Sequence, residues 1–168
     1  MSQMQNVKMG TCSVTYGGDD LGVTKGDVYL HWKPDLYSVE VENYGRASLD
    51  KKVMGEIYSV TVPLAESTLE NFKVAIPTLS KYANKATFGR KAGFSLLSLA
   101  KPLTLHPIDN EPEDLSDDIT IYKATSVSLT PIPYSNTKLR VLLIEFEGLV
   151  DPTRTDGDLV GTIGDPTT

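Results

Sequence analysis

The sequence predicts a mainly β protein, an antiparallel β-sandwich or barrel with one flanking α-helix. Two observations carry this prediction: apolar and polar residues alternate over most of the 168-residue chain, and one segment shows helical spacing instead. Apolar residues make up 40% and charged residues 23%, which excludes a disordered chain. We predict one β-domain over residues 1–149 and a flexible C-terminal tail over 150–168, where Gly, Pro, Thr and Asp dominate.

Alternation with a period of two predicts the strands. The candidates in chain order are 12–16, 21–24, 27–32, 36–42, 53–64, 94–99, 103–106, 119–129 and 139–147. Trp32 lies on the apolar side of its strand, which predicts that it packs in the core. On the strand 36–42, burial of Tyr37, Val39 and Val41 leaves the intervening polar residues on the other face. The stretch 139–147 is apolar on both faces, so we expect it to be a central strand.

One segment departs from the alternating pattern and predicts the single helix, over about 67–76. Ser67 and Glu70 have the spacing of a capping box, in which the serine hydroxyl accepts a hydrogen bond from the Glu70 amide. Apolar residues then recur at near-helical spacing up to Pro77, which limits the continuation. A lone amphipathic helix among strands most often covers one open end or face of a sheet.

The connection at residues 43–52 is longer than the roughly two to five residues that are usual in a hairpin. Long loops on rigid sheets are usually functional or disordered. This loop keeps the apolar residues Tyr44 and Leu49, so we predict that it docks on a partner surface.

The net charge of -6 equals the charge of one decapeptide. Residues 109–118 carry six acids and no base, whereas the segment between Asn71 and Ile108 carries six bases and no acid. The acidic total argues against a general nucleic-acid binder, which needs clustered Lys and Arg. The two segments either pair between subunits, or they pair within one chain or face solvent. The sequence leaves both alternatives open.

No pattern predicts catalysis, a metal site or a cofactor. The chain has one cysteine, Cys12, and two histidines, His31 and His106, in no metal-ligating spacing. The glycine-rich stretch 17–26 lacks the ending of a phosphate-binding loop, and 109–118 lacks the glycine and glutamate that an EF-hand needs. We therefore expect that the protein is not an enzyme and binds no cofactor.

Targeting signals are not apparent. Residues 1–6 lack the apolar core of a secretory signal, and no apolar run approaches the roughly 20 residues that span a bilayer. We expect a soluble protein of a reducing compartment that does not bind membranes by itself.

Three features, in this order, resemble the tail tube proteins of long-tailed bacteriophages, particularly those with flexible, non-contractile tails. A glycine-rich strand-turn segment comes first, TYGGDDLGVTKGDV at 15–28. A long hairpin with an extended loop follows at 36–64. The sequence LAESTLENF at 64–72 then resembles the helix start of that family. The motifs cover about residues 10–80, and the layout covers most of the chain.

The resemblance implies subunits that assemble as hexameric rings stacked into a hollow tube, with no catalysis. In that family a tape measure protein occupies the lumen, double-stranded DNA passes through it without specific binding, and tail-tip and tail-terminator proteins meet the ends. The implied location is the virion tail, assembled in the bacterial host cytoplasm. The alternatives are an inner tube protein of a contractile tail or a type VI secretion ring protein, and a monomeric ligand-binding β-sandwich.

Three sets of residues are the candidate functional sites of such a tube. The lumen-facing set, polar or acidic so that DNA phosphates are repelled, is Ser38, Glu40, Glu42, Ser59 and Thr61. The ring-stacking set is Tyr44, Arg46, Leu49, Asp50, Lys51 and Lys52. The set for charge contacts between subunits is Lys81, Lys85, Arg90, Lys91, Glu113, Asp114, Asp117 and Asp118.

Overall fold

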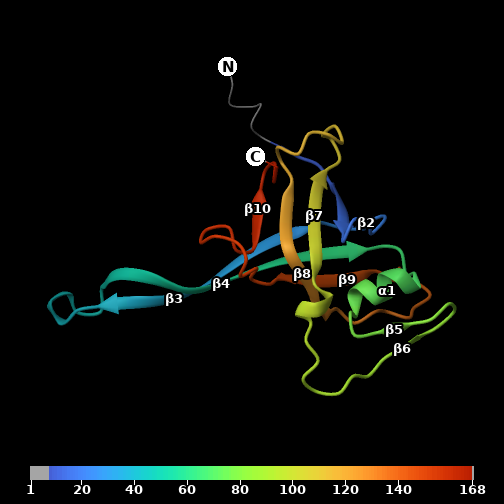
Figure 1. Cartoon of the computed structure of the whole chain (residues 1–168), viewed down its shortest axis with the longest axis horizontal. Coiled ribbons are helices and arrows are strands. Elements are labelled where there is room, and N and C mark those ends of the chain that lie inside the picture. The colour runs from blue at the N-terminus through green and yellow to red at the C-terminus, as the bar shows by residue number, and fades with distance from the viewer. Residues whose placement is uncertain (1–7, 168) are drawn as a thin grey trace.

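The computed structural model describes residues 8–167, which form one twisted antiparallel sheet with a single short α-helix (Figure 1). The strand order is β2 (Asp19–Asp20), β1 (Cys12–Tyr16), β7 (Lys101–Pro107), β8 (Ile119–Leu129), β9 (Leu142–Gly148), β4 (Ser48–Leu64) and β3 (Tyr29–Glu40). A further strand, β10 (Gly161–Ile163), pairs with β8, and β5 (Ser80–Lys81) and β6 (Ala86–Thr87) form a separate ribbon. The predicted fold class, mainly β with one helix, is confirmed.

The alternating apolar residues meet in one core between two crossing parts of the sheet (Figure 1). Val60, Val62 and Leu64 of β4 are fully buried and belong to the same cluster as the inward residues of β1 and β7. The rings of Tyr16 and Phe146 lie 5.2 Å apart and connect β1 to β9 in this core. One sheet that folds over itself therefore supplies both walls of the core.

Several strands lie where the sequence predicts them. β1 and β8 have the predicted bounds, and β9 pairs with β8 on one side and β4 on the other, so it is the central strand that its apolar residues indicate. The predicted strand 21–24 is instead an isolated bridge from Thr24 to Leu64. The predicted strand 94–99 contains a 3-10 turn, η3 (Leu97–Leu99). The predicted strands 27–32 and 36–42 are parts of one continuous strand, β3.

The predicted helix is present as α1 (Leu69–Ala75), which begins one residue later than the capping box suggests. Thr68 is the N-cap, and its hydroxyl accepts a hydrogen bond of 3.2 Å from the amide of Asn71. Ser67 instead donates to the carbonyl of Arg140, 3.4 Å away. The buried hydroxyl of Ser126 on β8 donates to the last carbonyl of the helix, at Ala75, over 2.7 Å. The helix therefore packs on the sheet through β8.

The C-terminal segment, which the sequence predicts to be a flexible tail over 150–168, pairs with the sheet through β10. Residues 161–163 pair with 119–121 of β8, and the guanidinium of Arg154 lies 3.3 Å from the ring centroid of Tyr122. Gly161 makes this pairing possible, because a Cβ at that position would lie 2.4 Å from the carbonyl oxygen of Thr120. A strand of three residues contains too few alternating positions to be predicted from a sequence rich in Gly and Asp. No helix in residues 8–167 is long and apolar enough to span a membrane.

Candidate assembly surfaces

The most unusual feature of the protomer is a two-stranded arm, defined here as residues 29–58 of β3, β4 and their connection. It projects beyond the rest of the sheet, toward the left in Figure 1. β9 pairs with β4 only from residue 59 to residue 64, and β3 pairs only with β4. No residue from 29 to 57 is buried, because no third strand or helix of residues 8–167 covers this part of the hairpin.

Apolar side chains are concentrated on this uncovered arm. Eleven of the 23 large apolar side chains exposed in residues 8–167 lie between residues 29 and 57. They are Tyr29, Leu30, Trp32, Leu36, Tyr37, Val41, Tyr44, Leu49, Val53, Met54 and Ile57. Monomeric proteins rarely leave many large apolar side chains close together in water. The arm therefore has the composition of a surface that a partner covers.

Trp32 and Tyr37 show why the sequence misleads here. Both lie on an alternating strand, which predicts burial, but their side chains are 58% and 60% exposed. The prediction that Trp32 packs in the core is wrong: its indole Nε1 donates to Glu56 on the neighbouring strand, 3.1 Å away. The two side chains lie on opposite faces of β3, because only alternate residues of a strand share a face. Alternation therefore identifies an apolar side for each short segment, and it does not indicate whether the same chain covers that side.

The five predicted lumen residues do not share one face of the hairpin. Ser38 and Glu40 lie on the face of Val60, because alternate residues of β3 share a face and Leu30 pairs with Val60. Ser59 and Thr61, adjacent to Val60, lie on the opposite face. Ser59 is also only 8% exposed, because β3 and β9 flank β4 at this point, so the prediction that it lies on an exposed face is wrong.

The loop predicted to stack rings is shorter than expected, and it includes Glu42, one of the residues predicted to face the lumen. β3 ends at Glu40 and β4 begins at Ser48, so the connection is 41–47 and contains a 3-10 turn, η2 (Glu42–Tyr44). Glu42 therefore lies on this turn rather than on a strand. Tyr44 and Arg46 lie in the connection, and Tyr44 is 66% exposed. The other four predicted loop residues belong to β4: Leu49, Asp50, Lys51 and Lys52.

A groove of about 560 Å³ lies where the arm leaves the sheet. One wall is the arm itself, with Leu30, Val53 and Met54, and the other wall is the C-terminal segment around β10, residues 159–163. Ile163 on this second wall is 74% exposed. The groove extends the apolar surface of the arm toward the core.

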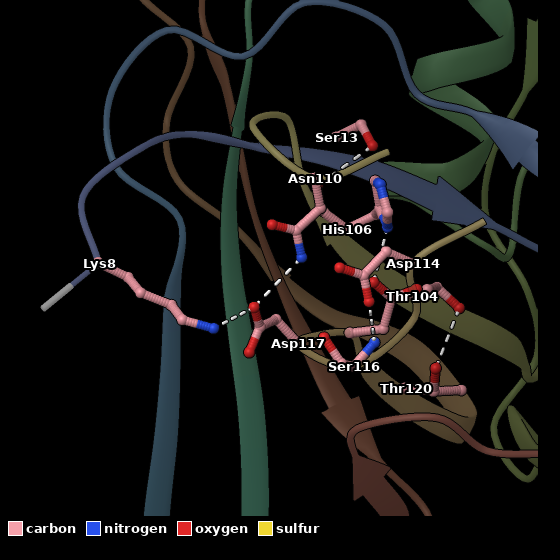
Figure 2. A network of polar contacts seen from close by, with 10 residues as sticks. Lys8, Ser13, Thr104, His106, Asn110, Asp114, Ser116, Asp117 and Thr120 are labelled. Carbon is pink, nitrogen blue, oxygen red and sulfur yellow. Dashed lines mark hydrogen bonds and ion pairs between the residues drawn. The ribbon is translucent and has the colours of Figure 1, made fainter. Parts of the chain in front are cut away.

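The acidic decapeptide is anchored to its own protomer at its C-terminal end (Figure 2). Asp117 pairs with Lys8 and accepts a second hydrogen bond from Asn110, and these contacts lower the pKa of its carboxyl. Asp118 is 3% exposed, and its Oδ1 lies 2.6 Å from Nδ1 of His106. Asp118 is therefore not available for the predicted contact between subunits. Glu113 and Asp114 are exposed, and hydrogen bonds from the side chain and the amide of Ser116 lower the pKa of Asp114.

The predicted basic contact residues all lie on the long connection between α1 and β7, and all are exposed. Lys81 pairs with Glu70, which lowers the pKa of that carboxyl. Lys85, Arg90 and Lys91 form no ion pair within residues 8–167. No ion pair joins this segment to the acidic decapeptide in the described part of the protomer, so direct pairing of the two segments within one chain is not observed there.

Potential ligands for a metal are dispersed. No group of three or more His, Cys, Asp or Glu side chains in residues 8–167 is arranged to hold a metal ion. His31 lies exposed on the arm. Burial raises the pKa of the Cys12 thiol above its ordinary value, so the thiol is protonated at neutral pH.

Comparisons with known proteins find similarity of fold only. No protein family model and no curated protein matches the sequence. A chain of the sheath–tube complex of the PVC extracellular contractile injection system, in its extended state, aligns with a TM-score of 0.51 at 15% identity, over 88% of this chain and 92% of that chain. Hcp1 from Flavobacterium johnsoniae aligns with a TM-score of 0.39 at 13% identity, over 81% of this chain and 88% of its own, which is too distant to support an inference. The first likeness shows a shared, tail-tube-like fold, and it does not single out the long non-contractile class.

Proposed function

We propose that this protein is the structural subunit of a hollow tube, which it forms by assembling with copies of itself as stacked hexameric rings. The observation that carries the proposal is the arm, whose eleven large apolar side chains stay exposed in the described residues 8–167. The fold shared with a chain of a contractile injection system supports the same role. A protomer with such an arm is incomplete alone, and a second copy is the partner that is always available in a homo-oligomer.

The open sheet suits this kind of assembly. Within the described residues, β3 forms an edge of the sheet with no strand on its outer side, over the twelve residues from Tyr29 to Glu40. Edge strands with free amides and carbonyls pair readily with a neighbouring chain. If each of six subunits gave four strands, a barrel of about 24 strands would have a backbone diameter of about 45–50 Å. A duplex could pass through such a barrel after allowance for side chains.

The proposed cargo is double-stranded DNA, as in the long non-contractile phage tails that the sequence resembles. In this version the tube belongs to the virion tail, is assembled in the host cytoplasm, holds a tape measure protein before ejection, and meets tip and terminator proteins at its ends. Glu40 and Ser38 are the lumen candidates that remain exposed on one common face of the arm. A polar or acidic lining repels phosphate and prevents adhesion of the passing DNA.

The second version is the inner tube of a contractile tail or injection system, including a type VI secretion ring. The specific observation in its favour is that the structural neighbour with a TM-score of 0.51 comes from a contractile sheath–tube complex. A sheath that binds the outer surface of the tube distinguishes the two versions. Co-purification of the assembled tube with the protein of a neighbouring sheath gene would favour the contractile version.

Negative-stain electron microscopy of the purified full-length protein at high concentration tests the proposal. We expect hollow polymers or rings with a central hole and sixfold symmetry. A protein that stays monomeric at high concentration, both alone and after addition of tube ends from its own assembly system, would contradict the proposal. Saturable binding of a small ligand by that persistent monomer would instead support a ligand-binding β-sandwich.

A further inference from the structure

The two ends of the β7–β8 hairpin carry opposite charges. β7 runs from Lys101 to Pro107 and β8 returns antiparallel to it, so the connection between them lies at one end of the pair (Figure 1). The segments that enter β7 and leave β8, residues 77–100 and 130–141, meet the other end and contain no acid. We call this the basic end, and we call residues 108–118, which connect the two strands, the acidic end.

Cationic side chains at the basic end lie over aromatic rings. Three such pairs are present, with distances of 4.5–5.5 Å from the cationic centre to the ring centroid. The pairs are Lys85 with Tyr82, Arg90 with Phe94, and Arg140 with Tyr134. Phe88 in the same connection is 84% exposed. The basic end therefore offers positive charge and apolar rings together, which suits an acidic protein segment that also carries an apolar residue.

The cations at this end have few acids to neutralise them. Lys81 is the only one with an ion pair in the described part of the chain, to Glu70. Lys73 of α1 lies next to this end, where it donates to the carbonyl of Pro77, and its pKa is lowered first by burial and then by the positive charges of Arg90 and Lys101. Like charges are thus close enough to repel one another, and an external acid would relieve this repulsion.

The acidic end has a complementary surplus of negative charge. Two of its six acids have cationic or histidine partners within the protomer, Asp117 with Lys8 and Asp118 with His106. The other four are exposed and have no ion pair within residues 8–167: Asp109, Glu111, Glu113 and Asp114. Ile108, adjacent to them, is 60% exposed and can contact an aromatic ring.

We propose that the basic end of one copy docks on the acidic end of the next copy. Seven residues of β7 separate the two ends by about 20 Å, more than two Debye lengths of roughly 8 Å at physiological salt, so the ends cannot neutralise each other within one protomer. Because they point in opposite directions along the same strands, repetition of the contact builds a linear stack with one polarity, and like ends repel. The proposal rests on the proposed tube function and specifies how successive rings meet.

Duplex DNA is the other acidic partner that a basic, aromatic surface can attract. A second copy of the chain fits better for two reasons. Each copy supplies one acidic end for every basic end, and the net charge of -6 repels a polyanion from the protein as a whole.

A zero-length carbodiimide reagent, which joins carboxylates to lysine amines in direct contact, tests this contact in the assembled full-length protein. We expect cross-links from Glu111 or Glu113 to Lys85 or Lys91 in polymers and none in dilute protomers. The pair Lys81–Glu70 lies within one protomer and is the positive control in both samples. Polymers without end-to-end cross-links would overturn this inference and leave the tube function intact, whereas the absence of polymers would overturn both.

Charge-reversal variants provide the second test. Glu111→Lys/Glu113→Lys and Lys85→Glu/Lys91→Glu should each raise the concentration needed for polymerisation at least tenfold, and a variant that combines all four changes should recover most of this loss. The control Asp19→Lys/Asp20→Lys makes the same change in net charge as the first variant, at exposed positions of β2 that lie outside both ends, the arm and the groove, and should polymerise like the wild type.

Two results of this second test would show that the inference is wrong. One is unchanged polymerisation of both reversed variants. The other is binding of duplex DNA that the base-reversed variant alone loses while its polymers form normally, which would assign the basic end to nucleic acid.

Discussion

Replacing both apolar residues near the tip of the arm, in the variant Tyr44→Ser/Leu49→Ser, should separate folding from assembly. Their side chains are 66% and 62% exposed in the protomer, so the substitutions remove almost no contact within the chain. Surface changes of this kind usually alter the free energy of unfolding by less than about 0.5 kcal/mol. We therefore expect a protomer with wild-type stability that assembles only at a much higher concentration.

The size of the assembly defect follows from the exposed fractions. Complete burial of a large apolar side chain stabilises by about 1.5–3 kcal/mol, and roughly two-thirds of each side chain is still available for burial by a partner. The double variant thus loses about 3 kcal/mol of assembly free energy for each added subunit. That loss corresponds to a rise of about a hundredfold in the critical concentration for polymerisation.

Sedimentation of polymers over a concentration series measures this shift, and thermal unfolding of the dilute protomer measures stability. Val23→Ser/Val127→Ser is a matched control, because these side chains are 64% and 46% exposed but lie outside the arm. The control should polymerise at the wild-type concentration. An arm-tip variant that polymerises equally well, or that loses several kcal/mol of folding stability, would refute the reasoning.

Three further changes test the packing of the protomer. Gly161→Ala places a Cβ 2.4 Å from a backbone oxygen of β8. Calorimetry should therefore show a loss of about 2 kcal/mol in the free energy of unfolding and a Tm roughly 5 °C lower. The control Gly55→Ala, whose Cβ would have no atom within 4 Å, should leave Tm unchanged. Thr125→Val removes a buried hydroxyl that has no hydrogen-bond partner within residues 8–167. Denaturant unfolding should therefore show a stability that is unchanged or up to about 1 kcal/mol higher, and a clear loss would reveal a partner for that hydroxyl. The ion pair with Lys8 lowers the pKa of Asp117 in the folded protein. The stability that this pair adds is therefore present above pH 3.8, the ordinary pKa of the carboxyl, and is lost as pH falls through the lower pKa of the folded state. The Tm deficit of Lys8→Met should therefore be visible at pH 6 and vanish near pH 2, and a deficit that persists in acid would contradict this assignment.

The parts of the fold that depend on local pattern could be predicted from the sequence. β8 combines alternation with a buried inner face, and β9 carries apolar residues on both faces, so both strands appear at or near their predicted positions. The helix was predictable because Ser67 and Glu70 have capping-box spacing and apolar residues then recur at helical spacing, although the N-cap is Thr68 rather than Ser67. β10 was not predictable, because three residues pair with β8 through close backbone contact rather than through an apolar pattern.

The candidate surfaces show a different limit of prediction. Alternation on β3 correctly indicates a strand, but Trp32 is exposed because, within residues 8–167, β3 pairs only with β4 and no further strand or helix covers that side chain. The charge segments are visible in the sequence, yet the burial of Asp118 beside His106 depends on how β7 and β8 pair. The basic contribution of Lys138 and Arg140 also emerges only from the fold, which brings residues 130–141 to the same end as the connection that follows α1.

A cryo-electron microscopy map of the assembled full-length protein, at a resolution that shows side chains, tests the central claim most directly. The arm should lie between neighbouring copies, with Trp32, Tyr37 and Tyr44 covered, around a hollow axis. A map in which the arms extend freely into solvent, or in which the polymer has no central channel, would contradict the account.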